Sequence, residues 1–250
     1  MQENLILQKK LTVNSSQVDM FRRMRLSALF SLLQEAAIEH TTLLGCGRDK
    51  TLDRGLLWIV THQSATISRM PIYDDTIILS TWAGKTMHMF FPRYWRLQDT
   101  KGNIIVEVSS LWVLLSETDR KIIFPEEYDI QIPFVQADEQ PAMPARTRMP
   151  KDFSIESDFP VPPSYVDMNG HMNNARYFDV VQDVLPFEWY KRDLKKVSME
   201  YVNEILLGET LKIKSLLQDN DAGSEAVIIG ESGAEAGKII FRMRLECQAV

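Results

Sequence analysis

The sequence predicts an α+β protein of two tandem domains, in each of which one long helix is wrapped by an antiparallel sheet. An internal repeat is the first observation behind this prediction. Residues 5–36 and 153–184 align without gaps and share eight identical pairs, where average residue frequencies give about two. Further along, residues 72–77 align with 206–211, at an offset of 134 residues in place of 148. The offset is smaller because the second copy lacks about 14 residues of loop. The chain therefore contains an internal duplication.

Each copy is predicted to begin with one strongly apolar helix, which is the second observation. Apolar residues recur at helical spacing through residues 26–37 in the first copy and through 177–185 in the second, where Pro186 ends the run. Gly45 and Gly47 follow the first helix in the sequence GCG. A glycine loop that binds nucleotides would follow a strand, so GCG predicts a helix terminator.

Four β-rich segments follow the helix in each copy. They are dense in β-branched and aromatic residues and are bounded by turn sequences such as DTKGN at residues 99–103. The segments are residues 56–67, 74–84, 88–99 and 103–115 in the first copy, and 197–205, 209–218, 225–232 and 238–250 in the second. The aromatic residues of the first copy are predicted to lie mostly in the core: Trp58, Trp82, Phe90, Phe91, Trp95 and Trp112.

Prolines concentrate between the two copies. Seven of the 11 prolines lie in residues 131–163, around the charged stretch QADEQ. Proline restricts the backbone, so this composition predicts a semi-rigid connection. We expect an N-terminal domain at residues 1–130, a proline-rich linker at 131–152 and a C-terminal domain at 153–250.

Bulk properties exclude several classes of protein. A net charge of −6 argues against a nucleic-acid binder. The basic clusters at residues 22–25, 146–151 and 191–196 are predicted to be solvated, with docking of an acidic partner as the alternative. Cys46 and Cys247 lack the spacing of a metal site or a disulfide framework. No apolar run is long enough for a membrane span, and MQENLILQKK lacks the apolar core of a signal peptide, so we expect a cytoplasmic protein.

Polar side chains alternate just ahead of the second helix. In SYVDMNGHMNNARYF the residues Asp167, Asn169 and His171 occupy every second position. If this stretch is extended, the three side chains point to one side. A helix beginning near Asn173 would add free N–H groups, which could bind a carbonyl oxygen of a substrate.

A purely structural role is the competing interpretation. Asn-Gly at residues 169–170 favours a tight turn, and an aspartate ahead of a helix is often a cap. Asp167 is matched by Asp19 in the first copy, which favours a structural contribution. Asn169 and His171 are matched by Phe21 and Arg23, so the first copy has lost the chemistry and one active site per chain is expected.

The pattern D-x-N-x-H-x-N-N followed by an aromatic-rich helix, present as DMNGHMNNARYF, resembles that of the hot dog thioesterases. The tandem arrangement, with RLSALFSLLQEAA in the first copy and MEYVNEI in the second, is similar to the acyl-acyl carrier protein thioesterases of bacteria and plants. This resemblance covers nearly the whole chain. It implies two tandem hot dog domains, an acyl-phosphopantetheine substrate on acyl carrier protein, and neither cofactor nor metal.

The same resemblance maps the catalytic acid onto Glu204, with Glu200 as a less favoured substitute. Glu204 is matched by Met70 in the first copy. In plant relatives a cysteine commonly follows this glutamate, but here the position is Ile205, which excludes a cysteine nucleophile. The resemblance also implies that aromatic residues of the first domain line a tunnel for the acyl chain.

The resemblance implies hydrolysis of an acyl-acyl carrier protein with release of free fatty acid. We expect Asp167 and Glu204 to hold and activate water, or one of them to attack directly. Asn169 would orient the reacting groups, and His171 would polarise the substrate or protonate the leaving thiolate. An acyl-CoA thioesterase and a non-catalytic acyl-thioester sensor are the alternatives, and the tandem domains fit a monomer or a homodimer.

Overall fold

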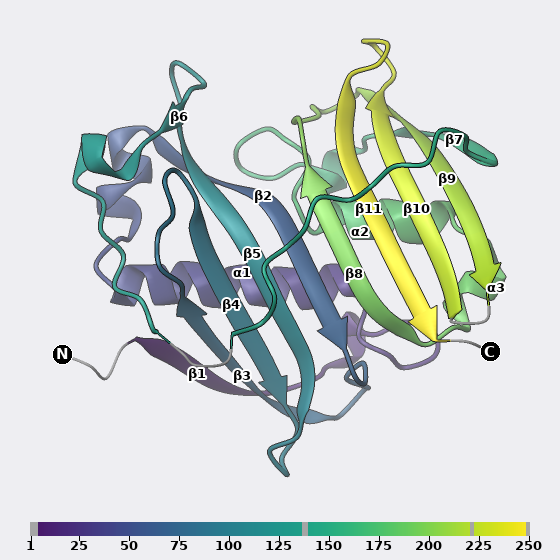
Figure 1. Ribbon diagram of the computed structural model, residues 1–250, viewed down its shortest axis with the longest axis horizontal. Helices are drawn as coiled ribbons and strands as arrows, with labels where there is room; N and C mark the ends of the chain where they lie inside the picture. The colour runs from purple at the N-terminus through teal and green to yellow at the C-terminus, as the bar shows by residue number, and fades with distance from the viewer. Residues whose placement is uncertain (1–4, 137–139, 221–222, 249–250) are drawn as a thin grey trace. The chain divides into compact units, whose positions relative to one another are not determined.

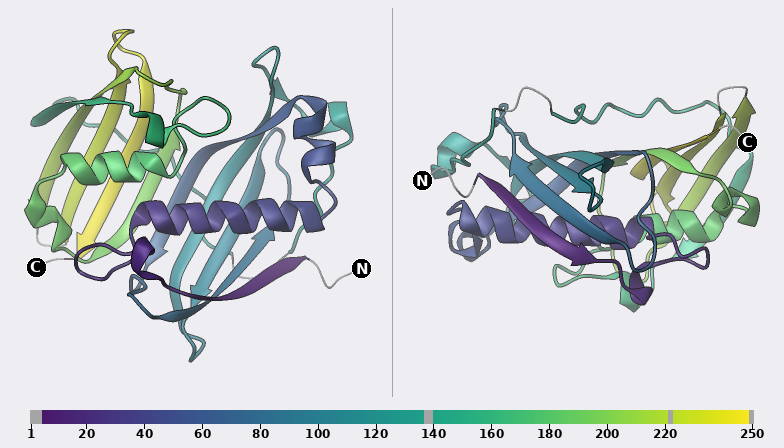
Figure 2. Two further views of the ribbon diagram at one scale, coloured as in Figure 1. Left: turned by 180° about the vertical axis from the view of Figure 1, so that it is seen from behind. Right: turned by 90° about the horizontal axis from the view of Figure 1, so that it is seen from below.

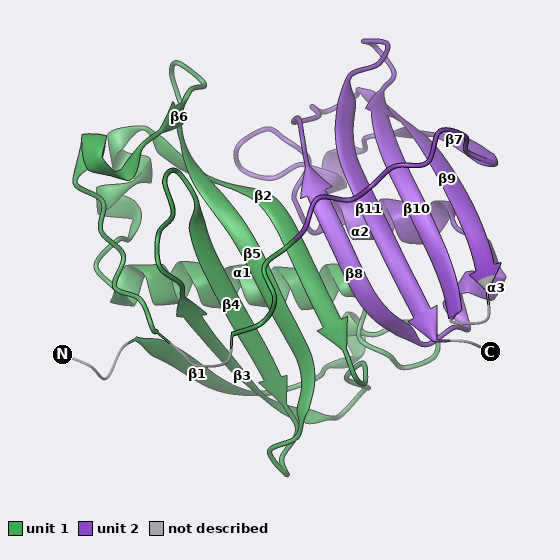
Figure 3. Cartoon of the chain, in the orientation of Figure 1, with its two compact units in different colours: residues 1–144 green, residues 145–250 purple. Residues whose placement is uncertain are grey.

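The computed structural model describes residues 5–136, 140–220 and 223–248. The chain forms two compact units, residues 1–144 and 145–250 (Figure 3). Each unit combines a helix with an antiparallel sheet (Figure 1), which confirms the predicted α+β class. Within the described ranges, no helix has both the length and the apolar character needed to cross a membrane.

The N-terminal unit has a sheet in the order β1-β3-β4-β5-β2, with the short β6 paired to β5. Every pairing is antiparallel. The elements are β1 (Ile6–Thr12), α1 (Leu26–Leu43), β2 (Leu56–Ile67), β3 (Thr76–Ala83), β4 (Phe91–Gln98), β5 (Ile104–Ser116) and β6 (Ile122–Ile123).

The C-terminal unit repeats this plan with the order β7-β9-β10-β11-β8, again antiparallel. Its elements are β7 (Ile155–Pro160), α2 (Arg176–Val184), α3 (Phe187–Tyr190), β8 (Leu194–Tyr201), β9 (Thr210–Asn220), β10 (Gly223–Ser232) and β11 (Ile239–Gln248). Apart from the short β6, each strand therefore has a counterpart at the same place in the other sheet, as the internal duplication predicts.

All eight predicted strands are present, but the first strand of each unit was not predicted. β1 (ILQKKLT) and β7 (IESDFP) are edge strands whose burial alternates between half-buried and exposed. Charged residues and a terminal proline are tolerated on an edge strand, because one side of the strand has no hydrogen-bonded partner. The same residues make the strand difficult to recognise from the sequence. The helix predicted at 26–37 extends to Leu43, whereas α2 stops ahead of Pro186 as expected.

The helices cover one face of their sheets (Figure 2). Leu29, Phe30 and Leu33 of α1 are buried, and Trp95 Nε1 of β4 donates a hydrogen bond to Leu33 O at 3.0 Å. Each such large apolar side chain contributes about 1.5–3 kcal/mol when fully buried. Six aromatic residues were predicted to lie mostly in the core. Trp82, Phe91 and Trp95 are buried, whereas Trp58, Phe90 and Trp112 are half-buried.

The end of α1 confirms the predicted terminator. Gly45 has a φ of +78°, a conformation that costs a residue with a Cβ atom. Its N–H donates to Thr42 O at 3.0 Å, and the Cys46 N–H donates to Thr41 O at 3.0 Å. These two bonds satisfy the last carbonyls of the helix in a Schellman motif.

Candidate active site

The polar loop ahead of α2 is a closed turn, so the condition of an extended segment, under which the three side chains would point to one side, does not hold. Gly170 N–H donates to Asp167 O at 3.0 Å, and Asp167 N–H donates to His171 O at 2.9 Å. Asp167 Oδ1 accepts the Asn169 N–H at 2.8 Å, and Gly170 has a φ of +80°. Asp and Asn-Gly favour such turns, which is the structural role weighed for Asp167 above.

A second turn lies directly beside this loop and carries the glutamate. Met172 N–H donates to Ile205 O at 3.0 Å, and His171 forms a β-bridge with Leu206. The pairing brings Glu204 to the histidine although 33 positions of sequence separate them. His171 Nε2 and Glu204 Oε2 are 3.3 Å apart, with the side chains 24% and 37% exposed. A protonated His171 therefore forms an ion pair that water can reach.

The four predicted site residues lie on these two turns, but their side chains differ in burial and in contacts. Asp167 is half-buried and Asn169 is exposed. The Asn169 backbone N–H donates to Asp167 Oδ1 at 2.8 Å, which holds the residue in the turn. The orienting role of Asn169 remains a prediction.

The start of α2 differs from the prediction of free N–H groups near Asn173. Asn173 N–H donates to Tyr165 O at 2.9 Å, and Asn173 Oδ1 accepts the Ala175 N–H at 3.0 Å. Arg176, the first helical residue, donates its N–H to Asn173 O at 2.9 Å. Because Tyr165 accepts the first of these N–H groups and Asn173 accepts the other two, none of the three is available to an oxyanion in this conformation.

Glu200, the weaker alternative to Glu204, has a separate role. Glu200 Oε1 accepts a hydrogen bond from Arg242 Nη1 at 2.7 Å, across the pairing of β8 with β11. Side chains alternate along a strand, so Glu200 faces away from its buried neighbour Met199. This cross-strand ion pair is largely shielded from solvent, because the side chains of Arg242 and Glu200 are 13% and 12% exposed.

Tyr177 is a residue beside the site that the sequence motifs did not single out. It lies in the first turn of α2 and is 3% exposed. Burial raises the pKa of its phenol well above the ordinary value, and the charges of Glu204 and Asp167 raise it further. The sequence pattern placed Tyr177 only among the apolar residues of the predicted helix. The sequence feature that could have distinguished it is its alignment with the aliphatic Leu29 in the first copy.

Comparison with known families assigns both halves of the chain. Residues 4–131 match the model of the acyl-ACP thioesterase N-terminal domain, and residues 149–244 match that of the acyl-ACP thioesterase C-terminal domain. The chain belongs to the acyl-ACP thioesterase family. The C-terminal match contains the loop and the second turn just described.

Individual relatives of this family agree with the assignment. The chain is 26% identical over 219 residues to acyl-[acyl-carrier-protein] hydrolase FATB2, chloroplastic, of Cuphea viscosissima, covering 81% of this chain and 53% of that protein. The chain thus spans about half the length of the curated plant proteins it matches first.

Solved structures of family members share the fold. The 12:0-ACP thioesterase from Umbellularia californica superposes with a TM-score of 0.82 at 22% identity, covering 98% of this chain and 94% of that one. An acyl-ACP thioesterase from Bacteroides thetaiotaomicron gives 0.80 at 20% identity, covering 99% and 100%. The prediction of two tandem hot dog domains is confirmed.

In this thioesterase-family chain, the N-terminal loop retains the backbone and the aspartate of the site without its histidine and glutamate. Asp19 N–H donates to Arg23 O at 2.8 Å, and Asp19 Oδ1 accepts the Phe21 N–H at 2.8 Å. Arg23 Nη2 lies 3.1 Å from Asp19 Oδ2, where the C-terminal loop has a histidine. The glutamate is replaced by Met70.

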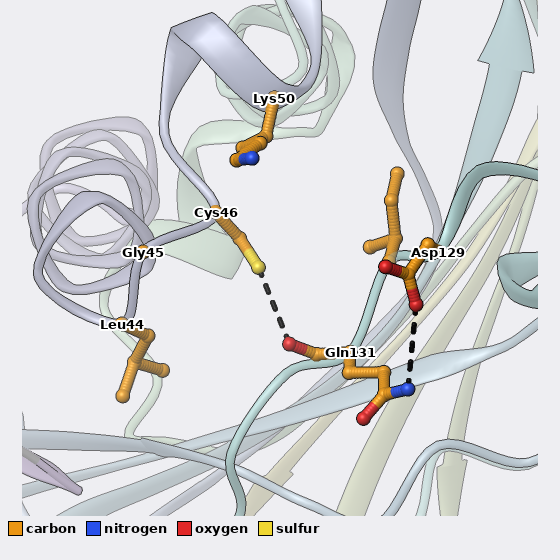
Figure 4. Close-up of a pocket in the computed structure, with 7 residues that line it drawn as sticks. Leu44, Gly45, Cys46, Lys50, Asp129 and Gln131 are labelled. Carbon is orange, nitrogen blue, oxygen red and sulfur yellow. Dashed lines mark hydrogen bonds between the residues drawn. The ribbon is translucent and has the colours of Figure 1, made fainter.

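The N-terminal unit also contains a pocket of about 270 Å³, formed by the end of α1, Lys50 and residues 129–131 (Figure 4). Cys46 points into it and donates from Sγ to Gln131 O at 3.4 Å. Burial raises the pKa of the Cys46 thiol, opposed by the charge of Lys50. A raised pKa disfavours the reactive thiolate.

Proposed function

We propose that the chain hydrolyses the thioester of acyl-acyl carrier protein and releases free fatty acid. The observation that carries this proposal is the 3.3 Å contact between His171 Nε2 and Glu204 Oε2, within the part of the chain that matches the family's C-terminal domain. A histidine beside a carboxylate supplies both an acid and a base. A thiol is a good leaving group because its pKa is about 8.5, so these groups suffice for hydrolysis.

The proposed reaction uses water as the nucleophile. Asp167 and Glu204 hold the water, and one of them accepts its proton as the oxygen attacks the carbonyl carbon. The tetrahedral intermediate then collapses, the C–S bond breaks with its electron pair on sulfur, and His171 donates a proton to the thiolate. Transfer of the proton from the carboxylate to His171, across the 3.3 Å contact if Glu204 is the base, restores the starting state.

The two domains have different roles in this proposal. The C-terminal domain, residues 153–250, carries Asp167, Asn169, His171 and Glu204 as the catalytic set. The N-terminal domain, residues 1–130, holds the acyl chain among its aromatic side chains, and the proline-rich linker at 131–152 joins the domains. The partner is acyl carrier protein with an acyl-phosphopantetheine arm, and we place the reaction in the cytoplasm.

Mass spectrometry of the products tests the proposal. The full chain is incubated in H₂¹⁸O with a panel of acyl-acyl carrier proteins and with the matching acyl-CoA thioesters. We expect free fatty acids with one ¹⁸O per molecule, formed faster from the carrier-protein substrates. Faster release from acyl-CoA would instead favour a hot dog acyl-CoA thioesterase. Tight binding of acyl carrier protein without release would identify a non-catalytic sensor.

A further inference from the structure

Two adjacent turns of the N-terminal unit expose large apolar side chains. Met20 lies on the loop that matches the active-site loop and is 74% exposed, and Phe21 beside it is exposed as well. Ile72 and Tyr73 lie on the second turn, and both are exposed. Single exposed apolar residues are common on proteins, but four of them gathered on neighbouring turns are typical of a binding surface.

Backbone contacts hold the two turns together. Tyr73 N–H donates to Arg22 O at 2.8 Å, and Arg23 forms a β-bridge with Ile72. The guanidinium carbon of Arg23 lies 4.9 Å from the centre of the Phe21 ring, a cation–π contact. The apolar side chains are therefore presented on a fixed backbone, so a partner that binds them has little chain to order.

The C-terminal unit repeats this exposure at the equivalent positions. Met168 stands at the place of Met20 and is 84% exposed, and Leu206 and Leu207 stand at the places of the exposed pair on the second turn. The N-terminal copy has thus kept its exposed apolar side chains although it lacks the histidine and the glutamate. Catalysis therefore does not account for them in this copy.

The two loops differ in charge. Residues 19–25 contain three arginines and one aspartate, whereas residues 167–173 contain one aspartate and neither arginine nor lysine. The chain as a whole has a net charge of −6 and repels an acidic protein. The N-terminal loop is a place where such a protein is attracted, because its local charge is positive.

Arg22 differs from the arginine that follows it. Its φ is +63°, where the other loop has Gly170, and this conformation is unfavourable for a residue with a Cβ atom. Arg23 pairs with Asp19, whereas the exposed Arg22 guanidinium has no carboxylate partner within the described part of the chain. An arginine that is held at a conformational cost and is unpaired in its own chain is available to an acidic partner.

We propose that a docking surface formed by Met20, Phe21, Arg22, Ile72 and Tyr73 binds acyl carrier protein through acidic and apolar side chains of the carrier. The identity of the partner rests on the function proposed above, because the carrier is the protein that this reaction requires. The arginine attracts carboxylates of the carrier, and the apolar side chains supply the area removed from water. The N-terminal copy of the loop thus has a binding role in place of a catalytic one.

The test measures binding of fluorescently labelled holo-acyl carrier protein, without an acyl group, to the full chain by fluorescence anisotropy. The double variant Phe21→Asn/Arg22→Gly installs the residues of the C-terminal loop, in which the same backbone N–H bonds the aspartate. We expect Kd to rise about fivefold or more and to depend less on salt, as when a charged and an aromatic contact leave an interface. In hydrolysis of acyl-acyl carrier protein, KM should rise likewise with kcat unchanged.

Arg120→Gly is the matched control. Arg120 is exposed in the same unit and has a φ of +54°, so the substitution removes the same charge from the same backbone conformation away from the docking surface. Its Kd should equal that of the wild type, with circular dichroism as the folding control. An equal loss in this control and in the double variant would show a response to net charge alone and overturn the proposal.

The remaining outcomes separate this proposal from the proposed function. An unchanged Kd in the double variant overturns the docking surface. A wild-type dimer that the double variant splits into monomers, with carrier affinity unchanged, assigns the surface to a second copy of the chain and also overturns it. A wild type that loses carrier affinity in the double variant but releases no fatty acid overturns the proposed function and supports the docking surface.

Discussion

The loops at residues 19–23 and 167–171 have the same backbone and different chemistry. In both, the aspartate N–H donates to the carbonyl of the residue four positions on, at 2.8 and 2.9 Å. In both, the aspartate Oδ1 accepts the N–H of the residue two positions on, at 2.8 Å. The second loop pairs its last residue, His171, with a carboxylate from another turn, whereas Arg23 of the first loop pairs with Asp19 of the same loop. The shared aspartate therefore builds the loop, and the histidine and the glutamate distinguish the site.

The comparison shows how a duplicated fold can lose chemistry without losing structure. Arg23 takes the place of His171 and forms an ion pair with Asp19 inside its own loop. That pair satisfies the carboxylate that the site would otherwise use. Function resides in side chains placed on a fold, and the fold of the N-terminal unit needs none of them.

The largest expected effect separates the two aspartates. Asp167→Asn should lower kcat at least a hundredfold with folding intact, since acid-base groups contribute about 10² to 10⁴. Asp19→Asn should leave kcat unchanged, because its loop has no reacting group. Steady-state kinetics on acyl-acyl carrier protein, with circular dichroism as the folding control, measures both. Equal losses in the two variants would show that the aspartates act through loop structure alone.

A residue exchange between the loops is the next test. His171→Arg should lower kcat by about a hundredfold or more, because the arginine cannot give up its proton to the thiolate. The melting temperature should stay near that of wild type, since Asp167 can pair with the arginine as Asp19 does with Arg23. Arg23→His should add no activity, because Met70 stands where the glutamate would be. Activity retained in His171→Arg would remove the histidine from the mechanism.

The smallest effect concerns the one backbone position where the loops differ in strain. Gly170 has a φ of +80°, whereas its counterpart Arg22 has +63°. No atom lies within 4 Å of a Cβ added at Gly170, so Gly170→Ala should cost only the conformational penalty of about 1 kcal/mol. Arg22→Gly should change the free energy of unfolding by less than about 0.5 kcal/mol, because relief of strain offsets the flexibility gained by the unfolded chain. Urea unfolding measures both, and a loss in Arg22→Gly as large as that in Gly170→Ala would contradict this account.

Much of the fold could be predicted from the sequence, because each helix or strand predicted in one copy is supported by the aligned segment in the other. The helices and the eight predicted strands have clear apolar periods, and the offsets of 148 and 134 residues align them correctly. The edge strands β1 and β7 were missed because their exposed sides carry lysines, acidic residues and a proline. An edge strand is fixed by its neighbour in the sheet more than by its own composition.

The site was predicted less completely. The residues were chosen from the motif, but the alternation of Asp167, Asn169 and His171 suggested an extended segment where Asn-Gly forms a turn. Periodicity cannot outweigh local turn chemistry over five residues. The pairing of His171 with Glu204 needs two turns held together by backbone hydrogen bonds, and no single stretch of sequence encodes that contact.

The central claim is that a single hydrolytic site exists, in the C-terminal half of the chain. The most direct measurement is the amount of ¹⁸O-labelled fatty acid released from acyl-acyl carrier protein in H₂¹⁸O by the wild type and by Glu204→Ala. We predict labelled acid from the wild type and at least a hundredfold less from the variant. Release of labelled acid by the variant at the wild-type rate would contradict the claim.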